Sequence, residues 1–153
     1  MPDSPPSLPS PIAVLTVTIN RLMILILTAA LFFLPYLVRW YYLFSHRSLE
    51  TYPAILICLY VSAAPAYGIL AALEILLRNI RRGEVFVALN VRLLRVISWC
   101  CLGVFVIFLI MGYSHLFSLL IAIGAAFIGL ILRVLMHVFA MAVRIKQEND
   151  FTI

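Results

Sequence analysis

Charged residues are scarce in this chain of 153 residues: only 11% are Asp, Glu, Lys or Arg. Soluble globular domains are about 25% charged and about 45–50% apolar, whereas 65% of this chain is hydrophobic. A chain this short buries only part of its surface on folding, so in water it would leave much of that apolar area exposed. The composition therefore excludes a water-soluble domain and predicts a single membrane-embedded domain.

Long basic runs are also missing, although the net charge is +5. The cationic residues lie at the ends of apolar segments, where they act as topology signals. We therefore expect no direct nucleic-acid partner.

The sequence contains no arrangement of residues that is typical of a catalytic or metal-binding site. Cys58, Cys100 and Cys101 lie within apolar segments without metal-ligand spacing, and we interpret them as buried thiols. His46, His115 and His137 are best read as interfacial polar residues. No Ser, Thr or Cys is placed with a histidine and an acid as a nucleophile requires. The sequence predicts no catalytic, cofactor-binding or metal-binding residue, and hence no enzyme.

Four long apolar segments follow a Pro- and Ser-rich tail, residues 1–11, which we expect to be disordered. A helix must contain about 20 apolar residues to cross a bilayer. The segments predict an all-α integral membrane bundle of about four transmembrane helices, in which one domain covers residues 12–153. Its expected helices are about 13–41, 52–80, 91–112 and 116–147.

Three short stretches mark the expected ends of these helices. Gly83 is placed to end the second helix, because glycine tolerates the left-handed conformation found there. Asn90 is a candidate N-cap of the third helix. Gly112–His115 is the polar break in a charge-free run from Val96 to Leu132, and we place a turn there.

Arginine and lysine are distributed unequally between the two expected membrane faces. Only Arg39 and Arg47 fall on one face. The other face receives the cationic residues of the second loop and both ends: Arg21, Arg78, Arg81, Arg82, Arg92, Arg95, Arg144 and Lys146. The positive-inside rule then predicts that both termini are cytoplasmic, in a plasma (inner) membrane.

Two charges, Glu74 and Arg133, are expected near or below the cytoplasmic interface, where ionisable groups are costly and often functional. One hypothesis pairs them across the second and fourth helices. The alternative pairs Glu74 with Arg78 one turn along its own helix, while Arg133 extends to the lipid headgroups.

Two stretches on the expected cytoplasmic face form a candidate docking face. Its residues are Arg81, Arg82, Gly83, Glu84, Phe86, Asn90, Arg92, Glu148, Asn149, Asp150 and Thr152. Acids at a helix C-terminus oppose the helix dipole, so Glu148 and Asp150 are expected to face Arg81, Arg82 and Arg92. The alternative for the carboxyl end is a solvated, frayed helix terminus.

The same two stretches resemble a bacterial membrane family catalogued as domain of unknown function 2975. Gly83-Glu-Val-Phe86, followed by Asn90, is similar to its G-x-x-F…N loop, with Val85 where the family often has proline. The ending Lys146-Gln-Glu-Asn-Asp-Phe-Thr-Ile153 is similar to its closing signature. The resemblance implies a small four-helix membrane protein that is often encoded beside a helix-turn-helix regulator.

The leading hypothesis is therefore a non-enzymatic membrane protein that regulates or interacts through its cytoplasmic face, with a cytoplasmic helix-turn-helix regulator as the candidate partner. Two alternatives remain open at this point: a small transporter or channel component, and an accessory subunit of a larger membrane complex. Homo-oligomerisation is compatible with each.

Overall fold

Four long helices account for most of the residues that the computed structural model describes, which are 11–44, 52–85, 87–113 and 116–150. They are α1 (Pro11–Phe44), α2 (Tyr52–Arg81), α3 (Ala88–Gly112) and α4 (Leu116–Asp150), and no strand occurs in these ranges. All four are long and apolar enough to cross a membrane. The predicted all-α fold with four membrane-spanning helices is confirmed.

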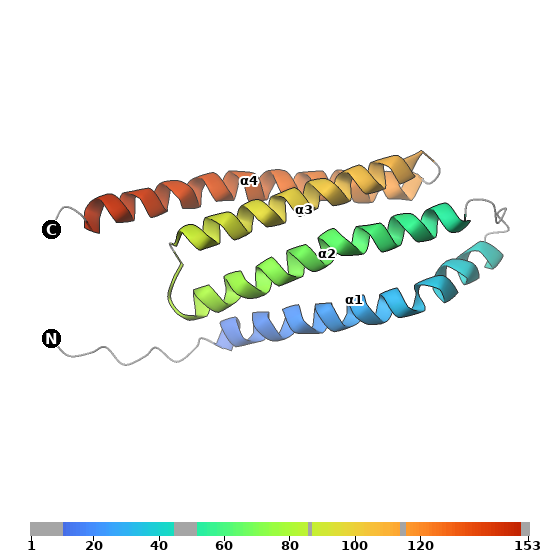
Figure 1. Cartoon of the computed structure of the whole chain (residues 1–153), viewed down its shortest axis with the longest axis horizontal. Coiled ribbons are helices and arrows are strands. Elements are labelled where there is room, and N and C mark those ends of the chain that lie inside the picture. The colour runs from blue at the N-terminus through green and yellow to red at the C-terminus, as the bar shows by residue number, and fades with distance from the viewer. Residues whose placement is uncertain (1–10, 45–51, 86, 114–115, 151–153) are drawn as a thin grey trace.

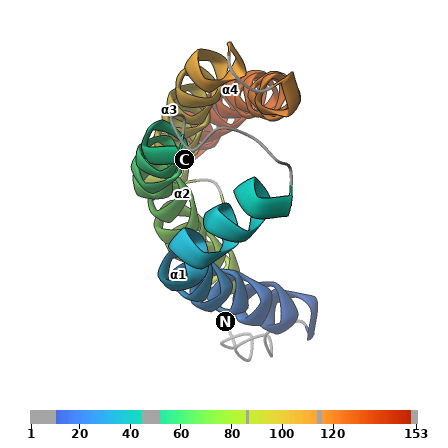
Figure 2. The same cartoon turned by 90° about the vertical axis from the view of Figure 1, so that its right-hand side faces the viewer.

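The helices lie in a curved row in which neighbours along the chain are neighbours in space (Figure 1). Seen from one end, the row forms an arc with α1 and α4 at its two extremes (Figure 2). The most extensive packing joins α3 to α4, and α1 contacts chiefly α2. The described ends of the chain, Pro11 and Asp150, lie at the same end of the row as the α2–α3 connection (Figure 1).

The observed helices exceed the expected ranges by a few residues. Pro11, assigned to the tail from the sequence, is the first residue of α1. The first turn tolerates proline, because the N–H groups there have no partner within the helix. The rest of the predicted disordered tail lies outside the described residues.

Gly83 ends α2 as predicted, with a φ of +77°. The Glu84 N–H donates to the Asn79 carbonyl and the Gly83 N–H donates to the Ile80 carbonyl, each at 3.0 Å. These two bonds form a Schellman motif, which satisfies the last carbonyls of the helix.

Close packing between α3 and α4 depends on Gly129. The Ser98 hydroxyl of α3 donates a 3.0 Å hydrogen bond to the Gly129 carbonyl. A Cβ atom on Gly129 would come within 3.2 Å of Cys101 Cβ, which is tighter than ordinary contact. Small residues allow such approach between helices in lipid.

Pro35 interrupts the hydrogen-bond ladder of α1, because proline has no N–H to donate to the Leu31 carbonyl four residues earlier. The Tyr60 hydroxyl of α2 donates to that carbonyl at 3.2 Å. A side chain of the neighbouring helix thus satisfies the backbone group that Pro35 leaves free.

Candidate functional site

Two buried asparagines shape the connection between α2 and α3. The Asn79 side-chain amide donates to Asn90 Oδ1 at 2.8 Å. The Asn90 amide donates in turn to the carbonyls of Glu84 and Val85, each at 2.8 Å. Asn90 has no exposed surface, so its side chain holds the connection from beneath.

The prediction that Asn90 caps α3 is wrong. The helix begins three residues earlier than predicted, at Ala88, and its N-cap position is Val87, which makes no side-chain cap. Instead, Asn90 Oδ1 accepts a hydrogen bond from the Asn79 amide, and the Asn90 amide donates to the Glu84 carbonyl. Because it is fully buried, Asn90 is also not a surface residue of the candidate docking face.

The charged residues in and beside the connection are exposed, together with Gly83. Arg81, Arg82, Gly83, Glu84 and Arg92 are exposed, and we call them the loop surface. Its three arginines outnumber its one acid, Glu84. Phe86, predicted to belong to this face, lies outside the described residues. The loop surface therefore carries a net positive charge on a backbone fixed by buried amides.

The carboxyl end of α4 extends past the start of α3. The two helices are consecutive in the chain and pack against each other. Because α4 has 35 residues and α3 has 25, the far end of α4 is the longer one. At 1.5 Å per residue the last ten residues of α4 reach about 15 Å further. Val143 is still buried, so α4 remains packed at the level of the α2–α3 connection.

The charges on this extension have a local ion pair. Arg144 Nε lies 2.9 Å from Glu148 Oε1, one turn along the same helix. Asn149 is exposed, α4 ends at Asp150, and Thr152 lies outside the described residues. The expected pairing of Glu148 and Asp150 with Arg81, Arg82 and Arg92 therefore stays a prediction.

A second polar cluster joins α1 to α2 around Glu74. Its carboxylate accepts a 3.0 Å hydrogen bond from the Asn20 amide and lies 3.3 Å from Arg21 Nε. Arg78 Nη2 lies 3.2 Å away, one turn along α2. The Asn20 amide also donates to the Leu70 carbonyl at 3.2 Å, so a single buried side chain of α1 ties two groups of α2.

The predicted pair between Glu74 and Arg133 does not form. The carboxylate is bound from α1 and from its own helix, and α2 and α4 are separated by α3 in the row (Figure 2). The alternative pairing with Arg78 is confirmed.

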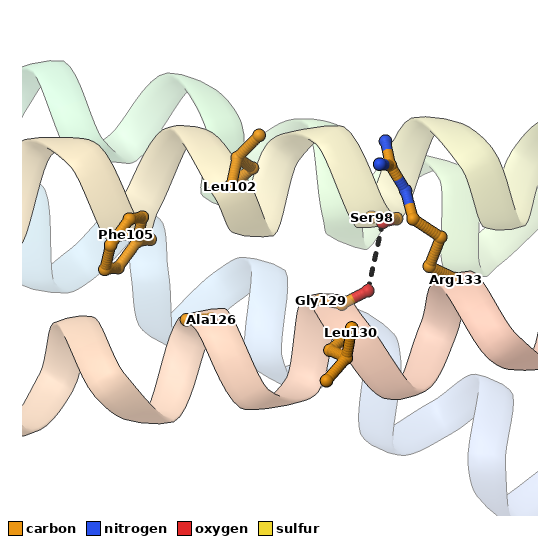
Figure 3. Close-up of a pocket in the computed structure, with 7 residues that line it drawn as sticks. All are labelled: Ser98, Leu102, Phe105, Ala126, Gly129, Leu130 and Arg133. Atoms are coloured by element: carbon orange, nitrogen blue, oxygen red, sulfur yellow. Dashed lines mark hydrogen bonds between the residues drawn. The ribbon is translucent and has the colours of Figure 1, made fainter.

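Arg133 lies instead against α3. Its guanidinium carbon is 5.1 Å from the centroid of the Trp99 ring, within the range of a cation–π interaction. Figure 3 shows Arg133 reaching from α4 toward α3, beside Ser98. A cavity of about 150 Å³ lies next to it, lined by Ser98, Leu102, Phe105, Ala126, Gly129, Leu130 and Arg133.

Three residues of these clusters were not identified from the sequence: Asn20, Asn79 and Trp99. Asn20 had a usable signal, because it is a polar residue beside Arg21 within an otherwise apolar helix. Asn79 and Trp99 had no such signal, since each gains its role only through the register of a neighbouring helix.

Comparison with known proteins identifies one family. A family model described as "Protein of unknown function (DUF2975)" matches residues 11–153. No curated protein and no solved structure matches the chain. The matched range includes all four helices, the loop surface and the carboxyl end.

Proposed function

The chain belongs to the DUF2975 family, and we propose that it is a non-enzymatic membrane protein that docks a cytoplasmic helix-turn-helix regulator. The docking face consists of the loop surface and the carboxyl end of α4. A partner held at the membrane in this way is sequestered from its target until it is released.

The orientation that the proposal requires is supported by the distribution of charge. The α2–α3 connection and both described ends lie at one end of the row (Figure 1), and this end carries Arg81, Arg82 and Arg92. At the opposite end of α1 lies Arg39. Short loops with this asymmetry place the cationic end in the cytoplasm, and for a bacterial chain this means the plasma (inner) membrane.

The observation that carries the proposal is the way the loop surface is built. Burying two asparagine side chains is costly unless their hydrogen bonds are made, and here three hydrogen bonds pair five polar atoms around the connection. A loop needed only to join two helices has no use for this internal framework. A loop that presents arginines to a partner in fixed positions does, because preorganisation lowers the cost of binding.

The charge of the loop surface also favours a protein partner with an acidic patch. Arg81, Arg82 and Arg92 are exposed, and exposed charges of one sign steer an oppositely charged surface and fix its register.

A transporter or channel component is the alternative from another functional class. That function requires polar groups at several depths along facing helices. The polar cluster around Glu74 and the asparagine pair both lie toward the end of the row that holds the α2–α3 connection. This placement favours a surface at that end over a path through the bilayer.

The test is co-purification in mild detergent of the full chain, tagged at its N-terminus, with the candidate helix-turn-helix regulator. Three variants are compared with the parent: a truncation after Val143, the double variant Arg81→Gln/Arg82→Gln, and the control Arg39→Gln at the opposite end of the row. Docking predicts that the first two lose the regulator and that the control keeps it. Equal recovery from all four would contradict the proposal.

A reporter fused to each terminus in turn keeps this test interpretable, because removing arginines also weakens the topology signal. The parent and every variant are expected to show both termini in the cytoplasm. Loss of the regulator from a variant of unchanged topology then reports on docking alone.

A further inference from the structure

An apolar groove lies between α2 and α3 on the surface of the row. It is open to the surroundings of the row and has a volume of about 550 Å³. Ala64 and Pro65 of α2 and Gly103 of α3 line its middle. Small side chains create this space, since a Cβ on Gly103 would meet only Pro65 Cβ, at 4.0 Å.

Arg95 lies at one end of this groove, and Arg133 contacts a tryptophan of its lining from α4. Arg95 and Trp99 lie one turn apart on α3, and both line the groove. Arg133 of α4 packs on the same indole, with its guanidinium carbon 5.1 Å from the ring centroid. In the part of the chain that the structure describes, no acidic side chain pairs with Arg95 or Arg133. One end of the apolar groove thus holds a cation and an aromatic ring, and a second cation lies against that ring.

The depth of these arginines matches a lipid headgroup. Arg95 lies seventeen residues before the end of α3 at Gly112, and Arg133 lies seventeen residues after the start of α4 at Leu116. Both are therefore about 25 Å from that end of the helices, in a hydrocarbon layer about 30 Å thick. This level is close to the headgroup region, where tryptophan is enriched.

We propose that this groove is a binding site for one anionic phospholipid. The headgroup phosphate lies between Arg95 and Arg133, and an acyl chain lies in the groove along Pro65 and Gly103. Guanidinium groups bind phosphate through charge-assisted hydrogen bonds. The site requires only that the chain spans a membrane, so it is independent of the proposed regulator.

Native mass spectrometry of the purified full chain in mild detergent tests the site. Phosphatidylglycerol and phosphatidylethanolamine with identical acyl chains are added in turn, so that only the headgroup charge differs. We expect the parent to retain phosphatidylglycerol in preference. Each arginine near a lipid surface contributes about 1 kcal/mol, so Arg95→Gln/Arg133→Gln should weaken retention by about 30-fold.

Three further variants separate the charge, the groove and the fold. Arg95→Lys/Arg133→Lys keeps both charges and should retain most of the binding. Ala64→Leu narrows the groove without a change of charge and should weaken retention of both lipids. The control Arg39→Gln removes an exposed arginine outside the groove and should behave like the parent.

Several outcomes would overturn the lipid site. One is equal retention of the two lipids by the parent, and another is an equal loss in the control. Displacement of phosphatidylglycerol by an equal concentration of glycerol 1-phosphate would assign the arginines to a soluble phosphate. Unchanged lipid binding by the Ala64→Leu variant, with normal helix content, would show that no acyl chain lies in the groove.

Discussion

Asn79 donates a hydrogen bond of 2.8 Å from its side-chain amide to Oδ1 of Asn90, across the connection between α2 and α3. Both side chains are buried. The pair joins the last turn of α2 to the first turn of α3, and Asn90 uses its own amide to bind two loop carbonyls. The exposed arginines of the loop surface rest on this framework.

Replacing Asn90 with alanine should destabilise the protein by about 2–4 kcal/mol, because the change leaves the Asn79 amide and two loop carbonyls without their partner. Chemical unfolding in detergent measures the loss. The exposed Asn149→Ala serves as the control and should change stability by less than about 0.5 kcal/mol. Similar stability of the two variants would show that the connection does not depend on its buried amides.

The contacts of Glu74 predict energetic coupling to Arg21 of α1 and none to Arg133. Two double-mutant cycles test these two expectations. A cycle between Glu74→Gln and Arg21→Gln should give a coupling energy below about 1 kcal/mol but above zero, since Arg21 is largely exposed and its pair is screened. The cycle between Glu74→Gln and Arg133→Gln should be additive. Strong coupling in the second cycle would restore the pair that the sequence suggested.

Two glycines of α4 should respond in opposite ways to alanine. Gly129→Ala crowds Cys101 and should cost about 1–3 kcal/mol. A Cβ on Gly124 meets nothing within 4 Å, so Gly124→Ala should be neutral or stabilising because alanine favours helix. Thermal unfolding of both variants in the same detergent is the measurement, and a larger loss at Gly124 would be inconsistent with the α3–α4 packing.

Tyr60 and Pro35 should show strong non-additivity. Tyr60→Phe removes the donor to the Leu31 carbonyl and should cost about 1 kcal/mol in the parent chain. In a Pro35→Ala background the same change should cost much less, because residue 35 then carries an N–H for that carbonyl. Equal costs of Tyr60→Phe in the two backgrounds would mean that the hydroxyl does not serve the carbonyl freed by proline.

Much of the fold could be predicted from the sequence, because each helix is specified locally. Apolar length identifies a membrane span, and Gly83 and the Gly112–His115 break mark ends that need no partner elsewhere in the chain. The assignment to the family also rested on two contiguous stretches, around Gly83 and at the carboxyl end, and the family match confirms it.

The partners of the charged residues could not be predicted in the same way. Local spacing identified Arg78 as a partner of Glu74, but Asn20 and Arg21 reach it only through the register of α1 against α2. Arg133 was matched to Glu74 because both are charges in apolar surroundings. Its aromatic contact with Trp99 depends on α3 lying between α2 and α4.

Photo-crosslinking from the loop surface in living cells tests the docking proposal most directly. A photoreactive residue replaces the exposed Glu84, and a second chain carries it in place of the exposed Tyr41, at the opposite end of the row. The account predicts that position 84 crosslinks to the cytoplasmic helix-turn-helix regulator and that position 41 does not. Crosslinks from position 84 only to membrane subunits or lipid, in a chain of normal abundance and topology, would contradict it.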